Sequence, residues 1–266
     1  MLGPMRVLVT GAARSIGRAT AEVLSERGHE VVATARDATL LADLKVDRVL
    51  SLDVSDDASV AAAVEAAGEL DAVVNNAGRT GSGPLEDYPL DDVVRVLDVN
   101  TLGPLRLIQA VVPQWRRRGS GVLVNVSSVQ GRIATPLEGV YAASKHALEA
   151  LSEALHYELG HFGIRVVIIE PGYISPGMKH TADHVGPDAY RVLHEQWSGT
   201  AETLSGPGGR PGPELVGHAV ADALEDPSTP LRVEVGQDAA MVLALRRAQT
   251  DAEFEATMRQ ALDLTW

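Results

Sequence analysis

Tyr141 and Lys145 are side chains that can move a proton, and they lie four residues apart. On a helix, that spacing places both on one face. A neighbouring ammonium group stabilises a phenolate and lowers the pKa of a tyrosine from its usual value of about 10. Such a phenol can exchange a proton with an alcohol near neutral pH. The pair therefore predicts acid–base chemistry, although the same pattern also occurs as a simple helix-surface contact.

Ser128 is the candidate partner for this pair, because it follows a strand-like run and precedes Tyr141. Its hydroxyl can hold a substrate oxygen beside the phenol and polarise a carbonyl. The adjacent Ser127 competes for the role, and a strand-end serine can also just satisfy loop backbone. Asn100 lies inside a predicted long helix, where it can disturb helix hydrogen bonding and anchor a water; the alternative is a core asparagine with its bonds satisfied.

A cofactor-binding turn is predicted between the first strand and the first helix, at Thr10–Gly17. Small residues there let the backbone approach a pyrophosphate, and the helix N-terminus supplies amide donors. Asp53 ends the third predicted strand and can accept from an adenine amino group, or it caps the following helix. Asn75–Gly78 ends the fourth strand, at the sheet edge where ligands bind, or forms only a tight turn. Together these features predict a dinucleotide site.

Two arginines favour NADP(H) over NAD(H). Arg36 follows the second strand, where NAD-specific sites usually carry a carboxylate for the ribose hydroxyls. Arg14 lies in the turn itself, and two guanidinium groups can grip a 2′-phosphate. Asp37 leaves NAD(H) open, because it directly follows Arg36 and can face the ribose instead.

These residues need a scaffold of alternating strands and helices, and the sequence predicts one. The expected strands are Val7–Val9, Val31–Ala35, Val49–Leu52, Leu70–Val74, Gly121–Val126, Ile164–Ile169 and Leu231–Val235. The expected helices are Ser15–Arg27, Asp56–Ala67, one within Asp91–Val112, and Val140–Leu159. Apolar strands alternating with helices predict an α/β fold, a Rossmann-type doubly wound parallel sheet of about seven strands with helices on both faces. We expect one domain over residues 1–266.

Two segments depart from this alternation. Residues 176–213 lack clean periodicity and contain a Gly/Pro cluster, which predicts a substrate lid. Residues 239–266 predict a C-terminal helical extension that either walls off a pocket or covers the sheet edge. Aromatic and apolar side chains in or near the first segment are expected to line an apolar pocket: Tyr173, Tyr190, Leu193 and Trp197.

Composition excludes several other classes of function. The chain has no cysteine, so disulfides and zinc–thiolate sites are ruled out. Its formal net charge of -13 argues against nucleic-acid or anionic-membrane partners. No signal peptide or spanning segment is expected, Met5 is a possible alternative start, and we expect a cytoplasmic protein. His180 and His184 have helical spacing but no third ligand in a metal-binding pattern, so no metal is predicted.

The combination of motifs resembles the short-chain dehydrogenase/reductase family, in its compact single-domain type. Asn75–Gly78, Ser127–Ser128, Tyr141 with Lys145, and Pro171–Gly172 occur in the family's order. The resemblance implies that Tyr141 is the general acid/base, that Ser128 orients the substrate oxygen, and that Lys145 binds the nicotinamide ribose. Asn100 is expected to support a water in a proton relay. The cofactor contacts expected from the turn and the resemblance are Gly11, Arg14, Ser15, Ile16, Gly17, Arg36, Asp53, Val54, Asn76, Ala77, Gly78, Tyr141, Lys145, Pro171, Gly172 and Ile174.

The chain departs from the family pattern at two places. Ser15 stands where the turn usually has its middle glycine, so it either adds a phosphate contact or crowds the turn. Ser175 and Pro176 occupy the region where a threonine often contacts the nicotinamide amide, which puts that contact in doubt.

The sequence therefore predicts an oxidoreductase that interconverts a ketone and an alcohol on a hydrophobic small molecule. Residues expected to meet this substrate are Ser128, Gln130, Tyr141, Tyr173 and Trp197. Two alternatives remain: a non-catalytic NADP(H)-binding sensor, and a lyase or epimerase on the same scaffold. The resemblance also implies a homodimer or homotetramer packed through Asp91–Val112 and Val140–Leu159.

Overall fold

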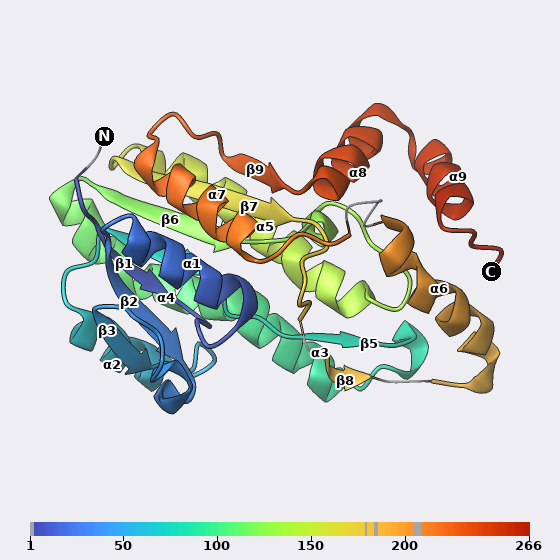
Figure 1. Ribbon diagram of the computed structural model, residues 1–266, viewed down its shortest axis with the longest axis horizontal. Coiled ribbons are helices and arrows are strands. Elements are labelled where there is room, and N and C mark those ends of the chain that lie inside the picture. Colours follow the sequence, from blue (N-terminus) through green and yellow to red (C-terminus); the bar gives the residue numbers. More distant parts are fainter. Residues whose placement is uncertain (1–2, 179, 184–185, 205–208) are drawn as a thin grey trace.

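The computed structural model describes residues 3–178, 180–183, 186–204 and 209–266 (Figure 1). Its centre is one parallel sheet of seven strands in the order β3-β2-β1-β4-β6-β7-β9. The strands are β1 (Arg6–Val9), β2 (Glu30–Ala35), β3 (Arg48–Ser51), β4 (Ala72–Asn75), β6 (Gly121–Val126), β7 (Ile164–Pro171) and β9 (Arg232–Val235). The strand order reverses between β1 and β4, and such reversal points create the crevice in which doubly wound sheets bind ligands. The predicted fold class is confirmed.

Helices cover both faces of the sheet, because alternate strand residues point to opposite sides. Val7 and Val9 of β1 pack under α1 (Ser15–Glu26) and α7 (Glu214–Glu225). Leu8 points the other way, into a core shared by helices α2 (Asp57–Ala67), α4 (Gly103–Arg118) and α5 (Gly139–Gly160). The five inner strands are therefore buried on both faces, as their apolar sequences predict, whereas β3 and β9 at the sheet edges are more exposed.

The long helix expected within Asp91–Val112 has a more complex structure. It consists of α3 (Leu90–Leu97), a π-helical turn at Asp98–Leu102, and α4, which continues past Pro113 to Arg118. π turns inside α-helices frequently lie at functional sites. This turn contains Asn100, the residue expected to disturb the helix.

The predicted lid segment contains regular structure that the sequence did not reveal. It includes β8 (His180–Asp183), a 3-10 turn (Asp188–Tyr190) and helix α6 (Arg191–Leu204). β8 pairs in parallel with β5 (Thr80–Ser82), whose three residues are too few for an alternating pattern. His184 and part of the Gly/Pro cluster lie outside the described residues, and the role of the segment as a lid stays a prediction.

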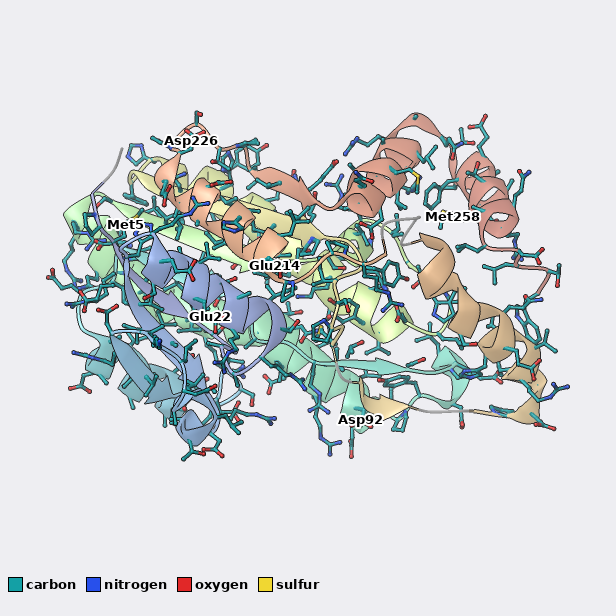
Figure 2. The ribbon with its side chains drawn as sticks, in the orientation of Figure 1. Met5, Glu22, Asp92, Glu214, Asp226 and Met258 are labelled. Atoms are coloured by element: carbon teal, nitrogen blue, oxygen red, sulfur yellow. The ribbon has the colours of Figure 1, made fainter. Side chains whose placement is uncertain are left out.

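The C-terminal extension is two helices rather than one continuous run. Helix α8 (Gln237–Ala248) is followed by α9 (Asp251–Ala261), which starts anew at a capping box formed by Thr250 and Glu253. Figure 2 shows side chains of α6, α8 and α9, Met258 among them, facing a common space at the end of the molecule opposite the N-terminus. Within the described residues, no helix is long and apolar enough to cross a bilayer.

Candidate active site

The predicted catalytic side chains come together at the carboxyl end of β6. Ser128 directly follows this strand, and its side chain lies near enough to the phenol of Tyr141, at the start of α5, to lower the pKa of that phenol. Ser128 Oγ also accepts from the Gln130 backbone N–H at 3.2 Å, which fixes its direction. The neighbouring Ser127 points elsewhere, and its buried Oγ has no hydrogen-bond partner within the described chain. The geometry therefore favours Ser128 over Ser127 as the partner of the phenol.

Lys145 lies one helical turn below Tyr141 and is almost fully buried. Its Nζ donates to the Val126 carbonyl oxygen at 2.8 Å and lies 5.7 Å from the centre of the tyrosine ring. Burial lowers the pKa of Lys145 to about 8, against the opposing effect of the Glu149 carboxylate. Near neutral pH the ammonium group is thus still mostly charged.

The pKa of Tyr141 differs from the expectation that Lys145 would lower it. Burial raises the pKa of this phenol above its usual range, and the neighbouring Ser128 side chain only partly offsets that effect. The negative Glu138 raises the pKa further. The Lys145 ammonium, which donates to the Val126 carbonyl oxygen, is not among the groups that shift this pKa. Tyr141 is accordingly a neutral phenol, ready to donate a proton.

Asn100 is fixed within the π turn by three hydrogen bonds. Its Oδ1 accepts from the Arg79 backbone N–H at 2.9 Å, and its Nδ2 donates to the Arg79 carbonyl at 2.9 Å and to Ser144 Oγ at 2.9 Å. Ser144 is on α5, between Tyr141 and Lys145. Asn100 thus ties the loop after β4 to the catalytic helix, while a water relay through it stays a prediction.

The predicted cofactor turn is packed tightly against the end of β4. Gly11 has φ +67°, and a side chain there would meet Ala77 Cα at 2.9 Å. A Cβ on Gly17 would lie 2.3 Å from the Gly11 carbonyl oxygen and 2.4 Å from Asn76 Nδ2. Asn76 donates from that nitrogen to the Thr10 carbonyl at 2.9 Å. The turn and Asn76–Ala77 therefore form one unit, and glycine is required where they touch.

Helix α1 begins in this turn with an uncapped N-terminus. Its N-cap residue, Arg14, makes no capping hydrogen bond, and the first turn holds no acidic side chain. Exposed first-turn amides and the helix dipole favour an anion, so the residues present fit a dinucleotide pyrophosphate. Ser15 adopts φ +46°, the left-handed conformation that a glycine would take without strain, and its Oγ donates to the Pro176 carbonyl at 3.0 Å. Ile16 follows within the first turn.

The two candidate phosphate-binding arginines are free. Arg14 and Arg36 are exposed and form no ion pair with any residue that the structure describes. Asp37 is occupied, because its Oδ1 accepts from Thr39 N at 3.0 Å and Thr39 Oγ1 at 2.6 Å and so caps a 3-10 turn. These hydrogen bonds hold the pKa of Asp37 below its usual value.

Asp53 is not the cap of helix α2, since that role belongs to Asp56. Its Oδ1 accepts from Ser55 N at 3.0 Å and Ser55 Oγ at 2.6 Å. Partial burial would raise the pKa of Asp53, but these hydrogen bonds and the positive Arg36 outweigh it and keep the pKa low. Val54 follows and packs against Gly103 at the start of α4.

The loop after β7 is held by Asp238, a residue that sequence reasoning missed. Its Oδ2 accepts from the Tyr173 backbone N–H at 2.6 Å, and a Cβ on Gly172 would clash with the same carboxylate at 2.2 Å. Asp238 is in the first turn of α8, so the extension positions the expected cofactor segment Pro171–Ile174. Ser175 is exposed, and within the described residues its only hydrogen bond runs from its backbone N–H to the Pro211 carbonyl at 2.9 Å, so its contact with a nicotinamide amide stays a prediction.

Three of the expected substrate residues line two adjoining spaces, whereas Ser128 and Tyr141 line neither. Gln130 and Tyr173 line a narrow space of about 20 Å³, whereas Trp197 lines a wider cavity of about 390 Å³. Gln130 is buried and donates from its Nε2 to Glu138. Burial raises the pKa of Tyr173 above its usual range, and the Arg210 guanidinium lies 5.4 Å from its ring centre.

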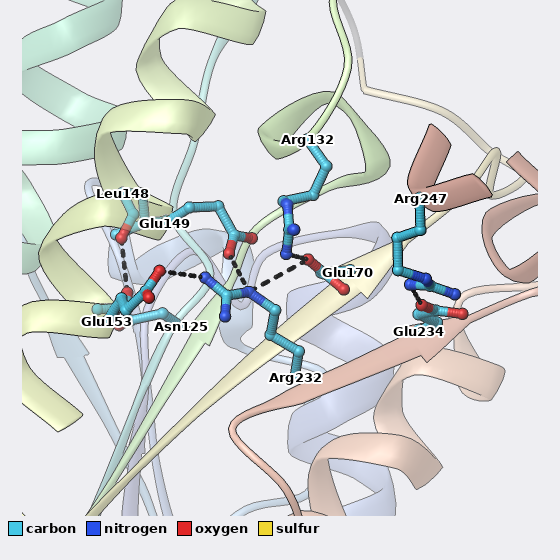
Figure 3. A network of polar contacts seen from close by, with 10 residues as sticks. Asn125, Arg132, Leu148, Glu149, Glu153, Glu170, Arg232, Glu234 and Arg247 are labelled. Carbon is cyan, nitrogen blue, oxygen red and sulfur yellow. Dashed lines mark hydrogen bonds and ion pairs between the residues drawn. The ribbon is translucent and has the colours of Figure 1, made fainter. Parts of the chain in front are cut away.

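An ionic network that we did not predict joins α5, β7 and β9, and its carboxylates Glu149 and Glu170 are buried (Figure 3). Arg232 of β9 donates from Nε to Glu149 Oε2 at 3.0 Å and lies 3.7 Å from Glu170. Arg132 lies 3.5 Å from the same Glu170 carboxylate. Burial, with the nearby Glu149 charge, raises the pKa of Glu170 to about 7. Lys145 and Glu149 have helical spacing, the one sequence signal that could have revealed this network.

Known proteins of one family are similar to this chain in sequence. Residues 5–185 match the family model of short chain dehydrogenases. A 3-ketodihydrosphingosine reductase of Bacteroides thetaiotaomicron is 36% identical over 178 residues, which cover 65% of this chain and 65% of that protein. The 17-beta-hydroxysteroid dehydrogenase type 1 of Mus musculus is 41% identical over 197 residues, 68% of this chain and 56% of the relative. This chain thus spans less than two thirds of the length of either relative.

Solved structures share the architecture over almost the whole chain. A short-chain dehydrogenase from Streptomyces avermitilis superimposes with a TM-score of 0.83 at 33% identity, covering 99% of this chain and 100% of that one. A short-chain dehydrogenase from Burkholderia cenocepacia in complex with NADP gives a TM-score of 0.77 at 26% identity, covering 99% and 98%.

Proposed function

The chain belongs to the short-chain dehydrogenase family, and from this premise we propose that it is an NADP(H)-dependent reductase of a ketone on a hydrophobic small molecule. The observation that carries the proposal is the juxtaposition of three side chains at the end of β6: Ser128, the Tyr141 phenol beside it, and a buried Lys145 one helical turn from Tyr141. A hydroxyl, a neutral phenol and an ammonium in this order match the needs of carbonyl reduction.

In the proposed mechanism, the substrate carbonyl oxygen lies between Ser128 and Tyr141. Ser128 orients and polarises it, and Tyr141 donates its proton to the oxygen as the alcohol forms. When bound, NADPH supplies the hydride and leaves a positively charged nicotinamide ring. Lys145 stabilises the resulting phenolate and, held by the Val126 carbonyl, is placed to contact the nicotinamide ribose.

Preference for NADP(H) is supported by the residues at the end of β2. Arg14 and Arg36 are exposed and unpaired within the described chain, so no existing ion pair must break for them to bind a 2′-phosphate. Asp37 already accepts two hydrogen bonds from Thr39, which reduces its capacity to accept from ribose hydroxyls. The NADP in the Burkholderia cenocepacia structure is consistent with this preference.

The test is consumption of NADPH, followed at the nicotinamide absorbance band, with a panel of lipophilic ketones. Ketone-dependent loss of NADPH by the native chain, reduced at least about 1000-fold in Tyr141→Phe, is expected from the loss of the acid. A Tyr157→Phe control removes an exposed phenol from the same helix and should behave like the native chain. Cofactor binding without consumption of any ketone would instead favour the sensor or the lyase alternative.

Assembly into a homodimer or homotetramer is proposed from the exposed apolar residues on the α3–α4 and α5 helices. Val94, Leu102 and Tyr157 are 64%, 45% and 76% exposed, and such residues are typical of surfaces covered by a partner. Light scattering on the protein as it elutes from a size-exclusion column measures the mass of the assembly directly. A monomeric mass would contradict this proposal.

A further inference from the structure

A cavity lies outside the catalytic centre, at the C-terminal end of the molecule. It has a volume of about 390 Å³, and neither Ser128 nor Tyr141 lines it. Its wall is mostly apolar and comes from the loop after Ser128, from α6, and from α9 with its tail: Ile133, Leu193, Trp197, Phe254, Met258 and Leu262. The size and lining are those of a small-molecule site.

The cavity connects to the catalytic segment through a narrow neck. The neck has a volume of about 20 Å³ and is lined by Val129 and Gln130, which directly follow Ser128, and by Tyr173. Ile133 and Met258 line both the neck and the cavity, so the two spaces adjoin. A space that just holds a water molecule measures about 10–15 Å³. The neck has about the space of one small group, so an alkyl chain fits it more readily than a fused ring system does.

The charged groups at the cavity are already paired. Arg246 binds Asp251 at 2.7 Å and Arg259 binds Glu255 at 2.9 Å, while the Arg246 guanidinium also lies 5.5 Å from the Phe254 ring centre. No unpaired cation among the described lining residues remains to attract an anionic head group. The far end of the occupant is therefore uncharged.

The cavity wall is fixed in place, because the C-terminal tail binds helix α6. Gln196 of α6 donates from Nε2 to Thr265 Oγ1 at 2.7 Å, and its Oε1 accepts from Thr265 N at 3.2 Å and Trp266 N at 3.4 Å. The Trp266 ring packs against Tyr190, with the ring centres 5.8 Å apart. The C-terminal tail thus joins α6 and α9, which lie side by side in Figure 1, along one side of the cavity.

We propose that the substrate is a ketone with one unbranched alkyl chain, whose carbonyl lies at Ser128 and Tyr141 and whose chain passes the neck into the α6–α9 cavity. The inference rests on the proposed function for the carbonyl end only. The cavity is about twenty times as large as the neck, so it holds many methylene groups once a chain has passed the neck.

The experiment uses a series of unbranched 2-alkanones, from 2-hexanone to 2-hexadecanone. The specificity constant is expected to rise about three- to fourfold for each added methylene until the cavity is full, and then to level off. A cyclic ketone of fused rings with a similar carbon number should be a poor substrate. A flat series, or a fused-ring ketone as good as 2-dodecanone, would overturn the proposal.

Ala134→Trp tests the cavity itself, because Ala134 is an exposed loop residue that lines the wide part and not the neck. The variant should keep the native specificity constant for 2-hexanone. Its specificity constant for 2-dodecanone should be at least about tenfold lower than that of the native chain. Ala42→Trp, an equally exposed alanine outside the cavity, is the matched control and should retain the full series. Equal losses on short and long ketones in Ala134→Trp alone would contradict the assignment.

Binding without turnover separates this proposal from the proposed function. Two of the three tryptophans, Trp197 and Trp266, line the cavity, so 2-alkanones without cofactor should change the intrinsic fluorescence with a Kd that falls as the chain lengthens. Length-dependent binding without any NADPH consumption would support the cavity and contradict the reductase. Reduction of ketones without length dependence would support the reductase and contradict the cavity.

Discussion

Arg36→Ala provides a selective test of the cofactor preference. Arg36 is exposed and makes no ion pair with the described residues, so its removal should leave the melting temperature unchanged. A charge-assisted contact with a 2′-phosphate at an exposed site is worth about 1–2 kcal/mol. The expected loss in NADPH affinity is therefore about 5- to 30-fold. NADH lacks the phosphate and should bind within about twofold of the native affinity.

The assay is equilibrium titration of both cofactors by nucleotide fluorescence, with specificity constants measured alongside. Asp37→Asn is the matched control, because asparagine can still accept from Thr39 and keep the 3-10 turn capped. It should leave both affinities almost unchanged. An equal loss of NADPH and NADH binding in Arg36→Ala, or a selective loss of NADH binding in Asp37→Asn, would refute our interpretation of this site.

Three further predictions concern the catalytic helix and the turn. Lys145 loses its charge near pH 8 in the free protein, so the specificity constant should fall as the pH rises above about 8. Glu149→Gln removes the negative charge that stabilises the ammonium. In a pH–rate profile, this variant should move the fall to a pH lower by about 0.5–1 unit. Burial raises the pKa of Glu170 to about 7, so the folded state binds this proton more tightly than the unfolded state does. The free energy of unfolding therefore falls as the pH rises from about 4.5 to above 7. In denaturant titrations at pH 5 and 8, Glu170→Gln should remove about 1–3 kcal/mol of that loss. Gly17→Ala places a Cβ 2.3 Å from the Gly11 carbonyl and should weaken NADPH binding at least tenfold or prevent folding, as measured by titration and circular dichroism.

Each of these variants has a control elsewhere in the molecule. Glu153 also binds Arg232, but its side chain is 50% exposed and two turns beyond Lys145, so Glu153→Gln should not move the pH profile. Glu234→Gln removes a partly exposed carboxylate and should keep the native loss of stability between pH 5 and 8. A Cβ on Gly160 meets nothing within 4 Å, so Gly160→Ala should bind NADPH normally. If a control variant showed the same change as its test variant, the physical reason given for that test variant would be wrong.

The sheet could be predicted because its strands are apolar on both faces. All seven predicted strands are present, with ends displaced by at most two residues, since Leu8 and its neighbours on either side are buried in opposite cores. The helices that begin at Ser15 and Asp57 were also predicted to within a residue of their start. The local pattern of apolar residues was sufficient wherever the buried positions followed the repeat of a single helix or strand.

The remaining features depend on contacts between segments distant in sequence. β5 is three residues long and exists through its pairing with β8, about a hundred residues later, so no local pattern reveals it. Asp238 appears as an ordinary helix-start residue until the fold brings its carboxylate to the Tyr173 backbone N–H. The raised pKa of Tyr141 likewise follows from its burial, which cannot be predicted from its spacing to Lys145 in the sequence.

The central claim is tested most directly by following the hydride. The native chain would be incubated with 2-dodecanone and NADPH that carries deuterium at the transferable position of the nicotinamide ring, and the product analysed by mass spectrometry. We predict an alcohol that carries one deuterium on its carbinol carbon, formed in step with NADPH consumption and absent with Tyr141→Phe. An unlabelled product, or a product formed without net loss of NADPH, would contradict the account.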